Sequence, residues 1–368
     1  MSVLTIDGST GEGGGQILRT ALSLSILLAV PVRVVNIRAG RRQPGLRPQH
    51  VQAVKAAAAI CAAQVEGARE RSPELTFAPQ APPQAGSYHF DIGTAGAATL
   101  VLQTLLVPLS QAGGPSRVTV RGGTHVAWSP PYHYLEAVYL PALASLGYNA
   151  GVELVRWGFY PRGGGEIRAA IRPAAHRWPP ARAGAGTAQA DGPEDDLAQR
   201  EPLPWTQPRG ALHEVAVLSA AAHVGNQVTA RQASQAYNRL AAAGIHAQTR
   251  LLNPPSAGPG TCLFLLATFD GGTRAGFTGY GRRGYPAERV ADDAVDAFLA
   301  HHATDRTVDP YLADQLILPL SLAESPMTFE TSRITRHLLT NAWVVEQFLG
   351  RCFEIQGQEG QPGRIVRQ

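Results

Sequence analysis

The stretch VLTIDGSTGEGGGQILRTALSLSILLA, residues 3–29, decides the fold class. Residues 3–7 alternate in polarity and include β-branched side chains, which favours a strand. Residues 8–15 are rich in glycine, and residues 16–29 form an apolar run of helical length. A strand, a glycine loop and a buried helix in succession predict an α/β unit.

The following residues continue this alternation. Their patterns predict strands over 32–37, 88–92 and 117–121, and helices over 49–63, 97–109 and 134–146. The run GEGGGQI (11–17) also resembles PRGGGEI (161–167), which indicates an internal repeat. We therefore predict a large domain of repeated α/β units over residues 1–172.

The composition changes after residue 172. Residues 173–210 are rich in Pro, Ala, Gly, Asp and Glu, which predicts a flexible linker. Residues 211–283 then predict a small inserted α/β domain, with strands over 214–218, 245–251 and 262–269 and a helix over 230–243. Residues 284–368 return to the large domain, with helices over 286–301 and 309–322. The expected fold class is α/β (α+β), in two domains.

Composition limits the possible classes of protein. The chain has 368 residues, a length that suggests two domains, and 44% of them are hydrophobic, which is enough for a core of ordinary size. It lacks an apolar run of 18 residues and a basic leader, so we expect a cytoplasmic protein without a membrane span. Cys61, Cys262 and Cys352 are far apart, which argues against a zinc site and a disulfide framework.

Lys55 is the sole lysine, so 31 of the 32 basic residues are arginines. Enzymes that carry AMP on lysine usually place it in a KxDG motif, whereas Lys55 stands in AVKAA. A covalent nucleotide would therefore need another side chain. The planar guanidinium of arginine is also better suited than the lysine ammonium to paired hydrogen bonds with phosphate oxygens.

The glycine loop suits an anion, because its N–H groups and the following helix N-terminus point the same way. It has neither the Walker A nor the dinucleotide pattern. Glu12 would repel a phosphate unless a divalent cation lay between them. The alternative is a tight strand-to-helix turn with an exposed glutamate.

Arginines gather near this loop: the first 50 residues hold six, against only Asp7 and Glu12. Arg19 lies in an otherwise apolar helix and needs a partner. Arg38 and Arg41 follow a strand end, where α/β proteins bind ligands. From composition alone, a solvated basic loop is the simpler explanation of the cluster.

Two later segments carry further candidates. Tyr311, Asp314 and Gln315 share one helix face, where they could hold a nucleotide base or form an ordinary packed helix start. His337 stands in TRHLLTN (335–341), and is one of 11 histidines. We find no Ser-His-Asp elbow, HExxH motif or paired glycosidase carboxylates that the spacing singles out.

Taken together, these segments resemble the RNA 3′-terminal phosphate cyclase family. The matching motifs occur in the family's order and cover nearly the whole chain. They are GEGGGQILR (11–19), IRAGR (37–41), PGL (44–46), QH (49–50), IGTAG (92–96), TLVLQT (99–104), GGT (122–124), GFYP (158–161), GPG (258–260), YLADQ (311–315) and HLLTN (337–341).

The resemblance implies repeated α/β units similar to those of enolpyruvyl transferases, with an inserted smaller domain. It implies ATP, a divalent metal (Mg or Mn) and an RNA with a 3′-phosphate end. It makes His337 the adenylylated residue and Glu12 the metal ligand. Five positions would line the nucleotide pocket: Gln103, Pro130, Tyr311, Asp314 and Gln315. Six more would lie near the phosphates: Gln16, Arg19, Arg38, Arg41, Gln49 and His50.

The chain departs from the family pattern at two places. The 173–210 segment looks longer than the family suggests, and His125 stands where Asp or Asn is expected. Two alternatives remain: a non-catalytic relative that binds ribosomal RNA or ribosome-assembly factors, and an enolpyruvyl transferase. The presence of both His337 and Glu12 argues against the first, and the single lysine argues against the second.

Overall fold

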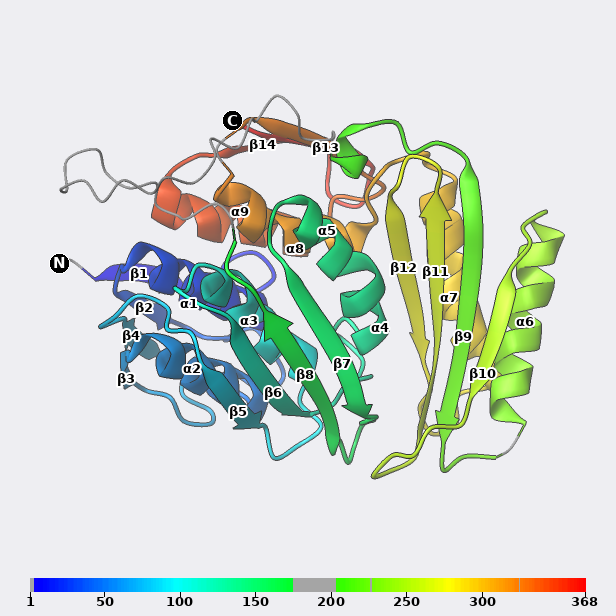
Figure 1. Cartoon of the computed structure of the whole chain (residues 1–368), viewed down its shortest axis with the longest axis horizontal. Helices are drawn as coiled ribbons and strands as arrows, with labels where there is room; N and C mark the ends of the chain where they lie inside the picture. The colour runs from blue at the N-terminus through cyan, green and yellow to red at the C-terminus, as the bar shows by residue number, and fades with distance from the viewer. Residues whose placement is uncertain (1–2, 175–202, 226, 324) are drawn as a thin grey trace.

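The computed structural model describes residues 3–174, 203–225, 227–323 and 325–368 (Figure 1). The large body, blue to green and orange to red, lies beside a smaller yellow-green body. The mixed α/β class is confirmed. None of the described helices is long and apolar enough to cross a membrane.

The large body contains a repeated βαβαββ unit. The first copy consists of β1 (Leu4–Asp7), α1 (Gly15–Leu28), β2 (Val32–Val35), α2 (Pro48–Cys61), β3 (Gln64–Glu66) and β4 (Leu75–Ala78). The second consists of β5 (Ser87–Asp91), α3 (Ala98–Ser110), β6 (Ser116–Gly122), α4 (Tyr132–Tyr134), the π-helical turn η1 (Leu135–Tyr139), α5 (Leu140–Ser145), β7 (Ala150–Arg156) and β8 (Gly165–Ile171).

Both copies have the same sheet order, β1-β2-β4-β3 and β5-β6-β8-β7. A third, incomplete copy consists of α8 (Pro310–Ser321), β13 (Met327–Thr331), α9 (Arg336–Leu349), β14 (Phe353–Gln356) and β15 (Gly363–Arg367). Its order is β13-β15-β14, and Val308 forms an isolated parallel bridge to Thr331 where a first strand would lie. One continuous apolar core joins the three copies.

The glycine echo seen in the sequence does not mark equivalent positions. The 11–15 loop leads from β1 into helix α1, whereas residues 161–164 lie in the turn between β7 and β8. Both runs serve tight turns, for which positive φ favours glycine, as at Gly11 and Gly163. The α/β units are repeated, as predicted, but the evidence for the repeat is their common sheet order and not the glycine runs.

The small body has its own sheet and core. Its elements are β9 (Leu212–Ala222), α6 (Val228–Ala242), β10 (Gln248–Leu252), β11 (Gly260–Phe269), β12 (Arg274–Tyr280) and α7 (Ala287–His302), with sheet order β10-β9-β11-β12. Val290 and Phe298 of α7 are buried in the same core as Phe277. The predicted boundary at residue 283 is therefore too early, because α7 packs on the small sheet.

The predicted linker is only partly a linker. Residues 175–202 lie outside the described residues. The described end of the segment is packed: Trp205, in η3 (Pro204–Thr206), is 4% exposed and belongs to the main core. The Arg209 guanidinium lies 4.4 Å over the Phe269 ring and pairs with Asp305 at 2.9 Å. Residues 203–210 thus anchor the chain between the two bodies.

Candidate active site

Four helix N-termini meet in the large body. The Gln16 amide of α1 donates to the His337 carbonyl of α9, at 3.3 Å. The side chain of Gln49 in α2 accepts from the N–H of Ala97, the N-cap of α3, at 2.9 Å. His50 lies beside Gly15, where a Cβ would come 2.4 Å from its Nε2 atom. Since helix N-termini carry positive partial charge, this junction favours an anion.

The glycine loop is docked on α9. Gly11 has φ +60, and a Cβ there would lie 2.3 Å from the Thr340 hydroxyl. That hydroxyl accepts a hydrogen bond from the backbone N–H of Glu12, at 3.1 Å. Only glycine combines this backbone conformation with so close an approach, so the sequence fixes where Glu12 stands.

His337 lies between two carboxyl groups. Its Nε2 atom is 2.5 Å from Oε2 of Glu12, and its Nδ1 atom is 3.8 Å from Oδ2 of Asp314. The side chain of His337 is 47% exposed, so an incoming group can reach it. Helix α9 starts cleanly before it, because the Thr335 hydroxyl caps the N–H of Leu338 at 3.0 Å. The backbone that carries His337 is therefore fixed, and one side of its ring is open to solvent.

The two carboxyl groups differ in acidity. Burial raises the pKa of Glu12, but hydrogen bonds from His337 and Arg41 outweigh it and lower the pKa to about 2. Burial raises the pKa of Asp314 to about 7, against the attraction of His337 and Arg19. Glu12 is thus an anion at neutral pH, whereas Asp314 titrates there.

The predicted arginines have different local roles. Arg41 pairs with the Glu12 carboxylate and donates to its carbonyl oxygen at 3.1 Å. Burial lowers the pKa of Arg19 to about 10, while Asp314 and Glu12 act to raise it. The carboxyl groups of Asp314 and Glu12 thus lie near enough to stabilise the charge of this buried arginine. Arg38 instead donates to the carbonyls of its own loop, at residues 43 and 45, at 2.8 and 2.9 Å.

His50 is a neutral part of the helix start. Its Nδ1 atom accepts from the Arg47 N–H at 3.0 Å, which completes a capping box at α2. Burial, followed by the charges of Arg19, Arg38 and Arg47, lowers the pKa of His50 to about 3. The ring can therefore accept or donate hydrogen bonds near an anion without titrating at neutral pH.

Helix α8 presents the predicted nucleotide-binding face. Asp309 caps it by accepting from the N–H groups of Tyr311 and Leu312, at 2.8 and 3.0 Å. The buried Tyr134 hydroxyl donates to Asp309 at 3.0 Å and fixes that cap. Tyr311 remains 43% exposed, and its carbonyl accepts from the Gln315 amide at 2.6 Å. The predicted i, i+3, i+4 face is thus present.

The remaining two pocket candidates adjoin this face. Gln103 of α3 donates to Gln315 at 2.5 Å. One turn earlier, the Thr99 hydroxyl donates to the Pro130 carbonyl at 2.8 Å, which ties the 123–131 loop to α3. The contacts therefore join Glu12, Gln16, Arg41, Asp314 and His337 at the helix junction, and Gln103 to Gln315 and Tyr311 on α8.

Two positions in the HLLTN motif have roles that we did not predict. The Asn341 amide donates to the Asp314 carbonyl at 3.1 Å, and its oxygen accepts from the Thr20 hydroxyl at 2.9 Å. Asn341 therefore joins α1, α8 and α9, and Thr340 holds the glycine loop. Their spacing of three and four residues from His337 was the available signal.

His125, at the departure from the family pattern, does not face the junction. It is 1% exposed, stacks on Trp157 with ring centroids 4.0 Å apart, and lies 2.9 Å from both Thr124 and His133. Burial holds the pKa of His125 well below its usual value. It is therefore a neutral core residue.

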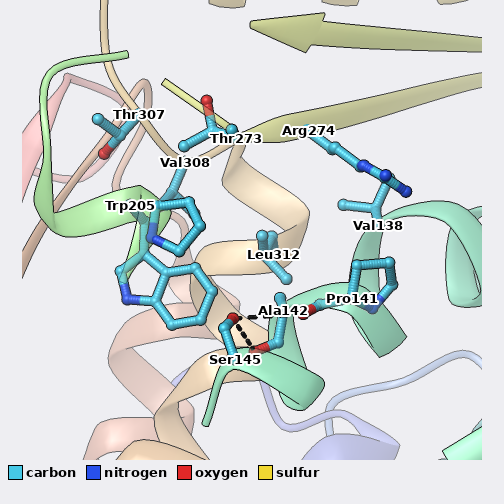
Figure 2. Close-up of a pocket in the computed structure, with 12 residues that line it drawn as sticks. Val138, Pro141, Ala142, Ser145, Trp205, Thr273, Arg274, Thr307, Val308 and Leu312 are labelled. Atoms are coloured by element: carbon cyan, nitrogen blue, oxygen red, sulfur yellow. Dashed lines mark hydrogen bonds between the residues drawn. The ribbon is translucent and has the colours of Figure 1, made fainter. Parts of the chain in front are cut away.

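A separate cavity of about 40 Å³ lies where η3 and β12 approach α5 and α8. Figure 2 shows Trp205, Leu312 and Ala142 around it. Its lining holds one charged residue, Arg274, and no histidine or carboxylate. Within the described ranges, no group of three or more His, Cys, Asp and Glu side chains is placed to hold a metal ion.

Known proteins match the chain over most of its length. The family model for RNA 3′-terminal phosphate cyclase matches residues 10–355. A relative of that name from Gloeothece citriformis is 43% identical over 94% of this chain and 93% of its own. One from Methylococcus capsulatus is 46% identical over 95% and 91%.

Among solved structures, the enolpyruvyl transferase NikO from Streptomyces tendae covers 43% of this chain and 30% of its own, with 15% identity and a TM-score of 0.25. That likeness is too low to carry an argument.

Proposed function

The chain belongs to the RNA 3′-terminal phosphate cyclase family, and we propose that it uses ATP to close an RNA 3′-phosphate onto the neighbouring 2′-hydroxyl through an AMP carried on His337. One observation carries this mechanism: the exposed His337 imidazole lies at a junction of helix N-termini, between Glu12 and Asp314. A nucleophile beside an anion-binding junction suits attack on a nucleotide phosphate.

In the first step, the His337 ring leaves its contact with Glu12, and Nε2 of the neutral imidazole, whose proton is on Nδ1, attacks the α-phosphorus of ATP. A P–N bond forms, the α–β P–O bond breaks, and pyrophosphate leaves. The ring proton then resides on Nδ1, which faces Asp314 at 3.8 Å. Arg41 is bonded to Glu12, and Arg19 lies near both Asp314 and Glu12, so the two arginines can balance the charge of the departing phosphates.

In the second step, an oxygen of the RNA 3′-phosphate attacks the AMP phosphorus and the P–N bond breaks, which frees His337. The RNA then ends in a pyrophosphate link to AMP. In the third step, the 2′-hydroxyl attacks the 3′-phosphorus, loses its proton and expels AMP. This last step is intramolecular, so proximity favours it.

The Glu12 carboxylate is suited to a divalent metal, Mg or Mn. It stays ionised at neutral pH, and magnesium sites of this kind need only one or two carboxylates beside phosphate oxygens. When bound, the metal would neutralise charge on the triphosphate.

The base of ATP would bind at one of the two predicted sets of residues, and the phosphates would bind at the other. The exposed Tyr311 ring can stack on adenine, with Gln103, Pro130, Asp314 and Gln315 around it. The phosphates would lie at the helix junction, near Gln16, Arg19, Arg38, Arg41, Gln49 and His50.

The main alternative is a non-catalytic relative of the same fold that binds RNA in ribosome assembly. The contact between His337 and Glu12 favours the enzyme, because a binding module has no need for a nucleophile there. An enolpyruvyl transferase is disfavoured because Lys55, the sole lysine, lies in the exposed part of α2.

A test uses RNA with a labelled 3′-phosphate, ATP and Mg²⁺ or Mn²⁺. We expect the label to become resistant to phosphatase, with one AMP and one pyrophosphate formed per RNA. An RNA whose last nucleotide lacks the 2′-hydroxyl should stop as the adenylylated end. Label that stays phosphatase-sensitive, with no pyrophosphate released, would reject the function.

A further inference from the structure

We propose that the single strand upstream of the RNA 3′ end lies across an aromatic–arginine surface, which consists of Trp128, Tyr160, Arg162, Arg282 and Arg283. This inference rests on the proposed function and adds a binding surface for its substrate. It is carried by the exposure of two aromatic rings, by the closeness of Trp128 to Pro130 along the chain, and by the charge around the rings.

Trp128 is 99% exposed, more than any other large hydrophobic side chain among the described residues. Its loop is nevertheless tied on both sides. The Ser129 hydroxyl donates to the Val126 carbonyl at 2.8 Å, and the Tyr280 hydroxyl of the small body donates to the Ser129 carbonyl at 3.3 Å. Trp128 itself has φ +66, a conformation that bulky residues rarely adopt. An ordered loop therefore holds an indole in solvent.

Trp128 borders the nucleotide pocket. Pro130 is two residues further on, so the two Cα atoms are at most about 7 Å apart. The Pro130 carbonyl is bonded to Thr99, one turn before Gln103, and Gln103 is bonded to Gln315 beside Tyr311. An RNA whose 3′ end is at His337 would pass this loop.

Tyr160 is the second exposed ring, at 76% exposure. Its neighbour Phe159 forms an isolated parallel bridge to His125. The pairing of Gly122 with Gly165 also places the loops 123–131 and 157–164 next to each other, at the same end of the sheet. The two aromatic residues therefore come from adjacent loops.

The surrounding charge fits a polyanion. Arg162 packs across Gly258, where a Cβ would lie 2.8 Å from its Cγ atom. Arg282 and Arg283 follow Tyr280, the residue bonded beside Trp128. The loops 123–131, 157–164, 253–259 and 281–285 contain these three arginines and no Asp or Glu. Strands β7, β9 and β12 all end on this side, at the lower edge of Figure 1.

Exposed aromatic rings among arginines are the usual platform for single-stranded nucleic acid. Bases stack on the rings whatever their sequence, and guanidinium groups contact the phosphates. The nucleotide immediately at the 3′ end stays at the helix junction. The surface would therefore act on the RNA upstream of the reacting end, and leave the reaction of His337 with ATP alone.

The test compares Trp128→Ala and Tyr160→Ala with wild type. The matched control is Tyr237→Ala, an aromatic residue 48% exposed on α6. Two quantities are measured: affinity for a 3′-phosphorylated single strand of about ten nucleotides, and labelling of the protein by α-labelled ATP without RNA. We expect each variant to bind RNA roughly tenfold more weakly, with labelling unchanged, and the control to match wild type.

RNA affinities equal to those of wild type would overturn the proposal. Loss of ATP labelling in Trp128→Ala would also overturn it, because it would show that the indole contacts the nucleotide. A wild-type protein that ATP does not label would instead contradict the proposed function, and the affinity comparison would still decide the surface.

A second measurement concerns charge. Arg283→Ala should reduce the slope of log affinity against log salt by about 0.7, the value for one phosphate contact on a single strand. Arg69→Ala, an exposed arginine of the first α/β unit, is the control and should leave the slope unchanged. An equal slope in the two variants would show that Arg283 does not contact an RNA phosphate.

Discussion

The Nε2 atom of His337 lies 2.5 Å from Oε2 of Glu12, although the two residues stand near opposite ends of the chain. The contact joins the first α/β unit to the third. Asp314 faces the other ring nitrogen, at 3.8 Å. The nucleophile is thus held between a permanent anion and a group that titrates near neutral pH.

We expect His337→Ala to abolish labelling by α-labelled ATP, a loss of at least about a thousandfold, because no other group replaces the imidazole. Since His337 is 47% exposed, the free energy of unfolding should change by only about 0.5 kcal/mol. His213→Ala, an exposed histidine of the small body, is the control. Full labelling of the His337 variant would reject the mechanism.

Glu12→Gln should raise the Mg²⁺ or Mn²⁺ concentration needed for half-maximal labelling by roughly tenfold or more, because the amide carries no charge for the metal. A metal titration of ATP labelling measures this. Glu74→Gln, which breaks a surface pair with Arg33, should titrate like wild type. An unchanged metal requirement in the Glu12 variant would exclude it as the ligand.

Asp314 should make the protein less stable as pH rises. Burial raises its pKa from 3.8 to about 7, so the folded chain holds a proton that the unfolded chain releases. Its contribution to the free energy of unfolding is therefore lost between about pH 4 and 7, by at most about 1.4 kcal/mol per pH unit.

Asp314→Asn removes this pH-dependent contribution to the free energy of unfolding. Urea unfolding of both proteins at several pH values should show the variant gaining stability relative to wild type across that window. Glu12, with a pKa near 2, acts below it and in the opposite direction, so the two groups are separable. Parallel pH profiles would show that Asp314 does not titrate there.

Gly11→Ala should lower the free energy of unfolding by about 1–3 kcal/mol, because φ +60 strains a non-glycine residue and the new Cβ meets the Thr340 hydroxyl. It should also reduce ATP labelling, since that hydroxyl positions Glu12. Gly113→Ala is the matched control, with nothing within 4 Å of its added Cβ. Equal urea midpoints for the two variants would contradict this account.

Local pattern predicted the long apolar helices best. Helix α1 was expected over 16–29 and spans Gly15–Leu28, because most of its residues are buried and its polar side chains are few and small apart from Gln16 and Arg19. Strand β7 was missed, since all of its residues are at least partly exposed and it lacks a buried apolar run. The helix expected over 134–146 is interrupted by the π-turn at Leu135–Tyr139.

The sequence also could not assign α7. Its amphipathic pattern predicts a helix, and either body could have covered its apolar face. Likewise, the composition of residues 203–210 suggested a linker, but Trp205 is buried in the main core and Arg209 pairs with Asp305. Both outcomes depend on which apolar surface was left uncovered elsewhere.

By itself, the sequence determined the α/β alternation, the family, and the residue types available for the chemistry, because these depend on local pattern and on ordered motifs. Only the tertiary structure decided that Glu12, Asp314 and His337 meet, and that Trp128 is left in solvent. The reason is that helix N-termini from separate α/β units converge only when the sheets pack around one core.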